Sequence, residues 1–272
     1  MSEHDARPIG VFDSGIGGLT VLKTLRQHFP AETFIYVADI ANLPYGEKTF
    51  SQIQGFAAQI LDWLAQQDVK LVVMACNTSS ALALDALKDA YPFPILGLIE
   101  PTAHALAHVS KRIGVMATAA TVNSRAYEKA FKQVNPDIEV FSVACPRLVP
   151  LIEAHQEQTP YARQCVEEYL QPLLAASIDT LVYGCTHYPY LAEVIREVLP
   201  EHITIADPAN YVTQAVKMYV DDAEPQTTGK PLLRFYATAD EQRLHAAAVK
   251  IWGEGYPVSW LNFDNIVAPR IS

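Results

Sequence analysis

The sequence predicts an α/β protein of two similar lobes, each a mostly parallel sheet flanked by helices, related by pseudo-twofold symmetry. Short aliphatic runs alternate with longer amphipathic segments along the 272 residues, an order typical of parallel α/β folds. Two stretches of the chain repeat the same order of runs. In each stretch one buried-strand pattern ends in a cysteine, Cys76 in the first and Cys185 in the second.

The first series of elements begins near the N-terminus. Its helices show apolar residues every three or four positions, as Ile53, Phe56, Ile60 and Leu64 do. Short aliphatic runs predict buried strands, at 9–12, 33–39, within 70–78 and at 94–100. The helices are predicted at 21–29, 51–67 and 79–91, and a loop is predicted at 41–49.

The second series repeats this alternation. Its strands are predicted at 112–116, 138–145, 180–184 and 203–207. A helix is predicted late in 117–132 and others at 161–177 and 188–199, with a loop or short helix at 146–155. The remainder predicts a helix at 209–221, a polar turn at 224–231, a strand at 232–238, a helix at 239–251 and a strand within 258–263.

The two series are similar in sequence as well as in order. IGVFDS from residue 9 resembles IGVMAT from residue 113, and FIYVAD from residue 34 resembles VFSVAC from residue 140. Cys76 and Cys185 occupy equivalent places in this repeat. Residues just past the carboxyl ends of parallel strands face the ligand crevice of such folds. Two lobes placed face to face therefore bring both thiols to one cleft, with the active site between them.

Composition excludes several classes of partner. The net charge is −10, from 30 acidic and 20 basic residues, and no Lys/Arg cluster stands out, so we expect neither a nucleic-acid nor a membrane partner. No apolar run approaches the roughly 18 residues of a membrane span, and the charged N-terminus is no signal peptide. Four scattered cysteines without a CxxC pair predict reduced thiols and a cytoplasmic protein.

Two thiols in equivalent places suit inversion of a carbon centre. A thiolate acts as a base and a thiol as an acid, and inversion needs one on each face of the carbon, so a racemase or epimerase is the natural use. Each cysteine precedes a predicted helix, whose N-terminus lowers a thiol pKa. Asp13 ends the strand expected beside the Cys76 strand, and His187 follows Cys185 by two residues.

Other interpretations stay open at this point. Cys76, Cys185 and His187 could ligate zinc, although only a Cys-x-His spacing supports it, and we predict no metal. The DSGIGG loop from residue 13 could cradle a phosphate, but it lacks the full GxGxxG spacing. Cys145 and Cys165 are interpreted as inert packing. Glu153 is either a solvated side chain or part of the site.

Four motifs together resemble the glutamate racemases of the aspartate/glutamate racemase family. They are DSGIGGLTVL, LPYGEKT, ACNTS and GCTHYPYL, in this order. The resemblance covers essentially the whole chain and implies a cofactor-independent isomerase that supplies D-glutamate for peptidoglycan. It also implies an inserted second lobe, 98–207, with 1–97 and 208–272 forming the first.

The resemblance assigns roles to residues by their place in the motifs. Cys76 and Cys185 are the acid/base pair, and Asp13, His187 and Glu153 assist proton transfer. The expected substrate-binding residues are Asp13, Ser14, Pro44, Tyr45, Gly46, Asn77, Thr78, Thr118, Thr121, Thr186 and His187. The chain departs from the family pattern at Ala117, Thr102 and Pro208.

Three alternatives to this function remain. One is a racemase of the same superfamily acting on aspartate or another amino acid, and another is a non-catalytic amino-acid-binding protein that keeps the fold. The third concerns the mechanism: a lysine could bind pyridoxal as a Schiff base, because the missing pyridoxal-binding signature does not exclude one. A homodimer is expected on general grounds.

Overall fold

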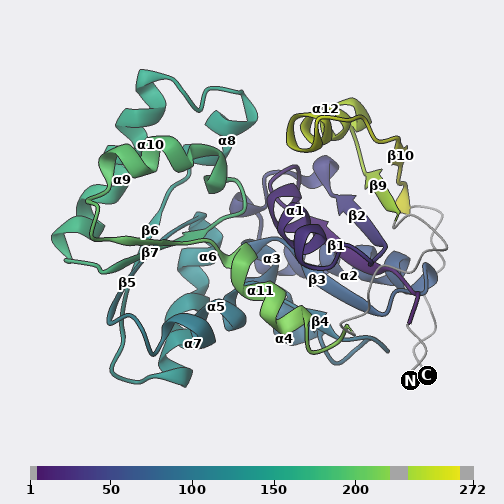
Figure 1. Cartoon of the computed structure of the whole chain (residues 1–272), viewed down its shortest axis with the longest axis horizontal. Coiled ribbons are helices and arrows are strands. Elements are labelled where there is room, and N and C mark those ends of the chain that lie inside the picture. Colours follow the sequence, from purple (N-terminus) through teal and green to yellow (C-terminus); the bar gives the residue numbers. More distant parts are fainter. Residues whose placement is uncertain (1–4, 221–231, 264–272) are drawn as a thin grey trace.

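The computed structural model describes residues 5–220 and 232–263, which form two lobes side by side (Figure 1). Each lobe contains one sheet, and every strand pair in both sheets is parallel. The turn predicted at 224–231 and the last residue of the helix predicted at 209–221 lie outside the described residues. No helix in the described part is both long and apolar enough to cross a bilayer.

The first sheet has six strands in the order β10-β9-β2-β1-β3-β4. Their bounds are β1 Ile9–Asp13, β2 Phe34–Ala38, β3 Leu71–Met74, β4 Ile95–Leu96, β9 Leu233–Ala237 and β10 Val258–Trp260. The second sheet has four strands in the order β6-β5-β7-β8. Their bounds are β5 Arg112–Ala117, β6 Glu139–Ala144, β7 Thr180–Gly184 and β8 Thr204–Ala206.

The predicted repeat is visible in the strand order. Val11 of β1 is paired with β2 on one side and with β3 on the other. Val115 of β5 is likewise paired with β6 and with β7. The order β2-β1-β3-β4 of the first sheet thus matches β6-β5-β7-β8 of the second, and the predicted class of two similar parallel α/β lobes is confirmed.

Helices cover both faces of each sheet. The α-helices are α1 Leu19–His28, α2 Phe50–Gln66, α3 Asn77–Leu82, α4 Leu84–Leu87, α5 Ile99–Leu106, α6 Ala119–Ser124, α7 Ala126–Val134, α8 Leu148–Glu153, α9 Pro160–Ala175, α10 Ala192–Val198, α11 Pro208–Val216 and α12 Glu241–Trp252. Three short 3₁₀ helices are η1 Ile40–Asn42, η2 Tyr45–Glu47 and η3 Tyr188–Leu191.

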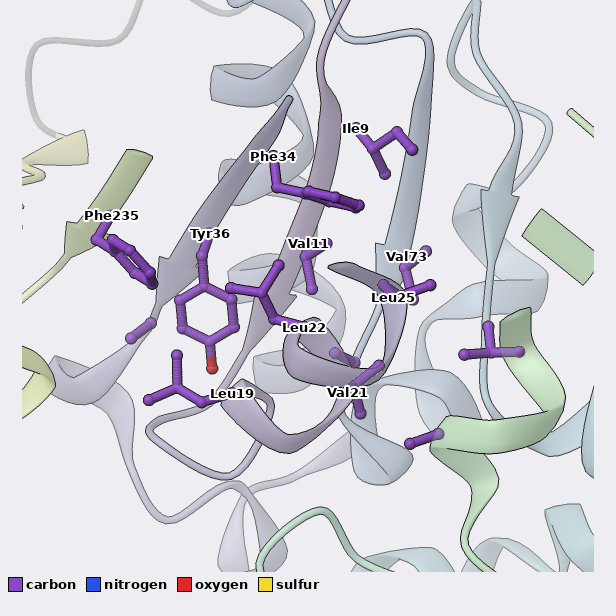
Figure 2. Packing of buried hydrophobic residues seen from close by; sticks show 14 of the residues in the cluster. Ile9, Val11, Leu19, Val21, Leu22, Leu25, Phe34, Tyr36, Val73 and Phe235 are labelled. Atoms are coloured by element: carbon purple, nitrogen blue, oxygen red, sulfur yellow. The ribbon is translucent and has the colours of Figure 1, made fainter. Parts of the chain in front are cut away.

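Alternate residues of each strand face opposite sides, so each lobe has two apolar layers. On one face of the first sheet, Val11 and Tyr36 pack against Leu22 of α1 (Figure 2). On the other face, Phe12 packs with side chains of α2. In the second lobe, Leu181 and Val182 face opposite layers, the first with α8–α10 and the second with α5 and α7. Buried layers on both sides fix the register and hold the strand ends in place.

Two predicted elements were wrong in extent. The helix predicted at 79–91 begins earlier, at Asn77, and is divided at Ala83, whose φ of −118° departs from helical geometry. The strand predicted at 94–100 is limited to Ile95–Leu96, and α5 begins at Ile99. The aliphatic run continues past the strand because Ile99, Ala103 and Leu106 form one buried helical stripe.

The chain passes from the first sheet to the second and returns. After β8 it runs through α11 and adds β9 beside β2, in parallel, with β10 outermost. Both proposed lobe boundaries, at 97/98 and at 207/208, fall between strands of different sheets. We retain the division into 1–97 with 208–272 and 98–207 as a proposal.

Candidate active site

A cavity of about 610 Å³, its open mouth included, lies where the carboxyl ends of both sheets converge. It receives residues that follow β1, β3, β5, β6 and β7, as expected for an α/β crevice. Its lining residues are Ser14, Leu43, Pro44, Tyr45, Gly46, Glu47, Cys76, Asn77, Thr78, Thr118, Ala119, Cys145, Pro146, Val149, Pro150, Cys185, Thr186 and His187. The two lobes therefore contribute one wall each, and each wall contains one of the paired cysteines.

Cys76 is the residue before α3 and is almost fully buried. Burial and the nearby Asp13 carboxylate raise the pKa of its thiol to about 12. This reverses the prediction that a helix N-terminus lowers the thiol pKa, because α3 has six residues and its small dipole is outweighed by the loss of water. In the free protein the Cys76 thiol keeps its proton and is equipped to act as an acid.

Cys185 lies beside an imidazole ring. Its Sγ is 3.8 Å from Nδ1 of His187, and Nε2 of the same ring is 2.6 Å from Oε1 of Glu153. Burial alone would lower the pKa of His187, but its hydrogen bonds to Cys185 and Glu153 raise that pKa to about 10. The ring is therefore charged at neutral pH and stabilises negative charge that develops on the Cys185 sulfur.

Asp13 is fully buried at the end of β1, the strand that is paired with β3. Its Oδ2 accepts hydrogen bonds from the backbone N–H groups of Gly15 and Gly18, at 3.1 and 3.0 Å. Burial raises the pKa of Asp13, although His187 and these N–H donors oppose the rise. Because the carboxylate occupies the N–H groups of the glycine loop, the structure does not support a phosphate cradle there.

Three threonine hydroxyls meet across the two lobes. Oγ1 of Thr78 lies 3.0 Å from Oγ1 of Thr118 and 3.3 Å from Oγ1 of Thr121. Next to them, Oδ1 of Asn77 accepts a 2.6 Å hydrogen bond from the Tyr127 hydroxyl. Nδ2 of Asn77 is buried and has no partner within the described chain. This donor, on a residue that lines the cavity, is available to an anionic ligand.

The loop before α2 forms one rim of the cavity and contacts the opposite lobe. The Tyr45 hydroxyl donates a 2.5 Å hydrogen bond to Asp39, which holds the loop against the first sheet. A Cβ on Gly46 would lie only 2.8 Å from Cβ of Thr118. Glycine at this position therefore lets the loop approach the second lobe closely.

Most of the predicted site residues line the cavity. Asp13, Glu153 and Thr121 do not, and instead they hold lining residues through hydrogen bonds to Thr186, His187 and Thr78. The sequence analysis missed seven lining residues: Leu43, Glu47, Ala119, Cys145, Pro146, Val149 and Pro150. Cys145 could have been found by the same strand-end rule that located Cys76 and Cys185. Cys165 lies in the core of the second lobe, outside the cavity.

Residues that could hold a metal do not gather in the described part of the chain. No three His, Cys, Asp or Glu side chains there are close enough to bind one ion together. The four cysteines are free thiols and all are buried.

Gly17 provides a test of how closely the glycine loop packs on His187. A Cβ at this position would lie 2.5 Å from Nδ1 of His187 and 2.5 Å from Oγ1 of Thr186. We expect Gly17→Ala to displace the imidazole from Cys185 and to lower turnover by about tenfold. Gly55→Ala is the control, because nothing lies within 4 Å of its Cβ, and it should raise helix stability by about 0.5–1 kcal/mol. Equal turnover in both variants would contradict the expectation.

Two similar α/β lobes that bring Cys76 and Cys185 from equivalent strand ends to a shared cavity define the class of two-base racemases. A profile of the Asp/Glu/Hydantoin racemase family matches residues 9–216. The chain belongs to this family.

Relatives within the family are similar along nearly the whole chain. A glutamate racemase from Trichormus variabilis is 47% identical over 270 residues, 99% of this chain and 92% of its own. The crystal structure of a glutamate racemase isoform from Bacillus anthracis is 35% identical, with a TM-score of 0.89 over 95% of this chain and 98% of that one. A glutamate racemase from Francisella tularensis, in complex with D-glutamate, is 34% identical, with a TM-score of 0.86 over 96% and 99%.

Proposed function

We propose that this protein interconverts L- and D-glutamate by moving the Cα proton between Cys76 and Cys185, without a cofactor. The observation that supports this most is that both thiols line one cavity, each at the end of an equivalent strand. Full-length similarity to glutamate racemases, one of them in complex with D-glutamate, supports the choice of substrate.

The reaction needs a base on one face of Cα and an acid on the other. A cysteine thiolate removes the Cα proton and becomes a thiol, and the electron pair stays on the planar carbanion. The opposite thiol then donates its proton to the other face and becomes the thiolate. The charged His187 ring stabilises negative charge at Cys185, whereas Cys76 begins as a protonated acid. The reverse reaction exchanges the two roles.

No arginine or lysine is among the residues that line the described cavity. Neutral hydrogen-bond donors therefore bind the substrate carboxylates. We assign this role to the hydroxyls of Ser14, Thr78, Thr118 and Thr186 and to the free amide donor of Asn77. Thr121 holds Thr78 and Thr118 in place. We assign Pro44, Tyr45 and Gly46, which line the rim of the cavity, to contact with the bound substrate.

The biological role follows from the product. D-glutamate is an amino acid of peptidoglycan precursors, and we assign its supply to this protein. The four free thiols suit the reducing cytoplasm. A homodimer remains our expectation for the assembly.

Deuterium incorporation tests the proposed function directly. Metal-free and pyridoxal-free protein is incubated with L-glutamate in D₂O, and the Cα signal and the enantiomer ratio are followed. We expect deuterium at Cα and an approach to equal amounts of both enantiomers, with a much lower rate on aspartate. Aspartate turnover that equals or exceeds glutamate turnover would identify another amino-acid racemase, and binding without exchange would identify a non-catalytic protein.

A further inference from the structure

One charged residue outside the catalytic cavity is connected to it through two side chains. Arg243 lies in the first turn of α12, in the segment that follows β9 of the first sheet. Its guanidinium binds Oε2 of Glu153, at the end of α8 in the second lobe. Figure 1 shows α12 and α8 on the facing sides of the two lobes. This ion pair therefore joins the lobes directly.

The two oxygens of Glu153 have separate partners. Oε2 is held by Arg243, and Oε1 is held by Nε2 of His187 at 2.6 Å. Nδ1 of His187 in turn faces the Cys185 sulfur. A carboxylate bound on both oxygens has one orientation, and it fixes the plane of the ring that it holds. The contacts thus form a continuous network from Arg243 in the first lobe, through Glu153 and His187, to the Cys185 thiol in the second lobe.

We propose that Arg243 is a positioning residue for proton transfer at Cys185: it holds Glu153 from the opposite lobe, so that His187 is oriented only while the lobes are together. This inference rests on the proposed function and adds to it a residue that the motifs do not contain. It also makes the reaction depend on contact between the lobes, since separation of α12 from α8 breaks the ion pair between Arg243 and Glu153.

The burial of Glu153 explains why the guanidinium matters. The side chain of Glu153 is only 9% exposed, and burial opposes its ionisation. His187 and Arg243 together hold its pKa below the usual range. Without Arg243, one oxygen of a buried carboxylate loses its partner, which is costly unless the side chain turns toward water. Such a turn withdraws the other oxygen from His187.

The guanidinium of Arg243 is accessible from solution. Arg243 lines a second cavity of about 490 Å³ together with Ile152, Tyr190 and Lys250. Its side chain is 31% exposed. A small guanidinium ion added to an Arg243→Ala variant therefore has a route to Glu153.

The contact predicts an effect on one direction of the reaction. These contacts end at Cys185, whereas Cys76 lines the same cavity from the first lobe. Removal of Arg243 should slow the step in which Cys185 takes the Cα proton more than the step at Cys76. The primary isotope effect of Cα-deuterated glutamate should then increase in one direction only.

The experiment compares Arg243→Ala, Arg243→Lys and Lys250→Ala in both directions of glutamate racemisation. We expect Arg243→Ala to lower kcat by about tenfold with KM changed by less than about twofold. The isotope effect should increase only in the direction in which His187→Asn also increases it. Added methylguanidinium should restore at least half of the lost kcat, and Arg243→Lys should retain more activity than Arg243→Ala.

Lys250→Ala is the matched control. It removes one positive charge from the same helix and the same cavity, and Lys250 is paired with Glu157 rather than with Glu153, so kcat should stay near wild type. Wild-type kcat in Arg243→Ala, a loss expressed in KM alone, or a loss that methylguanidinium leaves unchanged would each overturn the inference. Wild-type protein that does not racemise glutamate would instead refute the proposed function.

Discussion

Cys76→Ala and Cys185→Ala should each lower kcat for glutamate racemisation by about 10³-fold or more, since either change removes one of two required proton carriers. The remaining thiol can still take a proton from its own face, but the proton then returns to that face and the configuration is kept. Each variant should therefore exchange the Cα hydrogen of one enantiomer with D₂O slowly, and the two variants should select opposite enantiomers. Chiral chromatography and proton NMR measure both quantities.

Cys165→Ala is the control for these variants. It makes the same chemical change at a buried thiol in the core of the second lobe, away from the cavity. We expect a loss of stability from the small space that it leaves, with kcat near wild type at temperatures where the protein is folded. Racemisation that survives in both Cys76→Ala and Cys185→Ala would refute the two-thiol mechanism.

His187→Asn should lower kcat by about 10²-fold, because it removes the charged ring 3.8 Å from the Cys185 sulfur. The stability change should depend on pH. The pKa of His187 is raised to about 10 in the folded protein from about 6.5 when unfolded. A raised pKa contributes stability below about pH 6.5, and that contribution is lost as the pH rises through about 10.

Denaturant unfolding at pH 6, 8 and 10 measures this dependence. The difference in free energy of unfolding between wild type and His187→Asn should be largest at pH 6 and should shrink toward pH 10. His155→Asn is the control, because it makes the same replacement at an exposed residue after α8, and it is measured at the same three pH values. An equal difference in free energy of unfolding between wild type and His187→Asn at all three pH values would contradict a charged His187.

Strand ends were the part of the site that the sequence predicted well. The pattern of an aliphatic run followed by Cys76 or Cys185 requires only that parallel strands end at one crevice, and the lobes do bring both residues to one cavity. Cys145 directly follows β6 and lines the cavity, but the sequence analysis interpreted it as inert packing, as buried cysteines usually are. The rule that residues after parallel strands face the crevice therefore holds for Cys145 as well, but the sequence analysis applied it only to Cys76 and Cys185.

The remaining residues could not be predicted because they depend on how the lobes dock. Leu43 and Val149 line the cavity from segments of different lobes, with no periodic pattern to mark them. Arg243 meets Glu153 across 90 positions of sequence, and nothing local distinguishes it from other surface arginines. The pKa of Cys76 is raised rather than lowered because the thiol is buried, and the sequence motif does not reveal that burial.

The return of the chain to the first sheet has a consequence for biosynthesis. The outer side of β2 is covered only when β9 is added, and 194 residues, 39 to 232, separate these strands in the sequence. While the ribosome makes them, β2 presents unpaired backbone groups of the kind that recruit other chains. The inserted lobe can fold early, but the nascent polypeptide stays open to aggregation until its last fifth emerges.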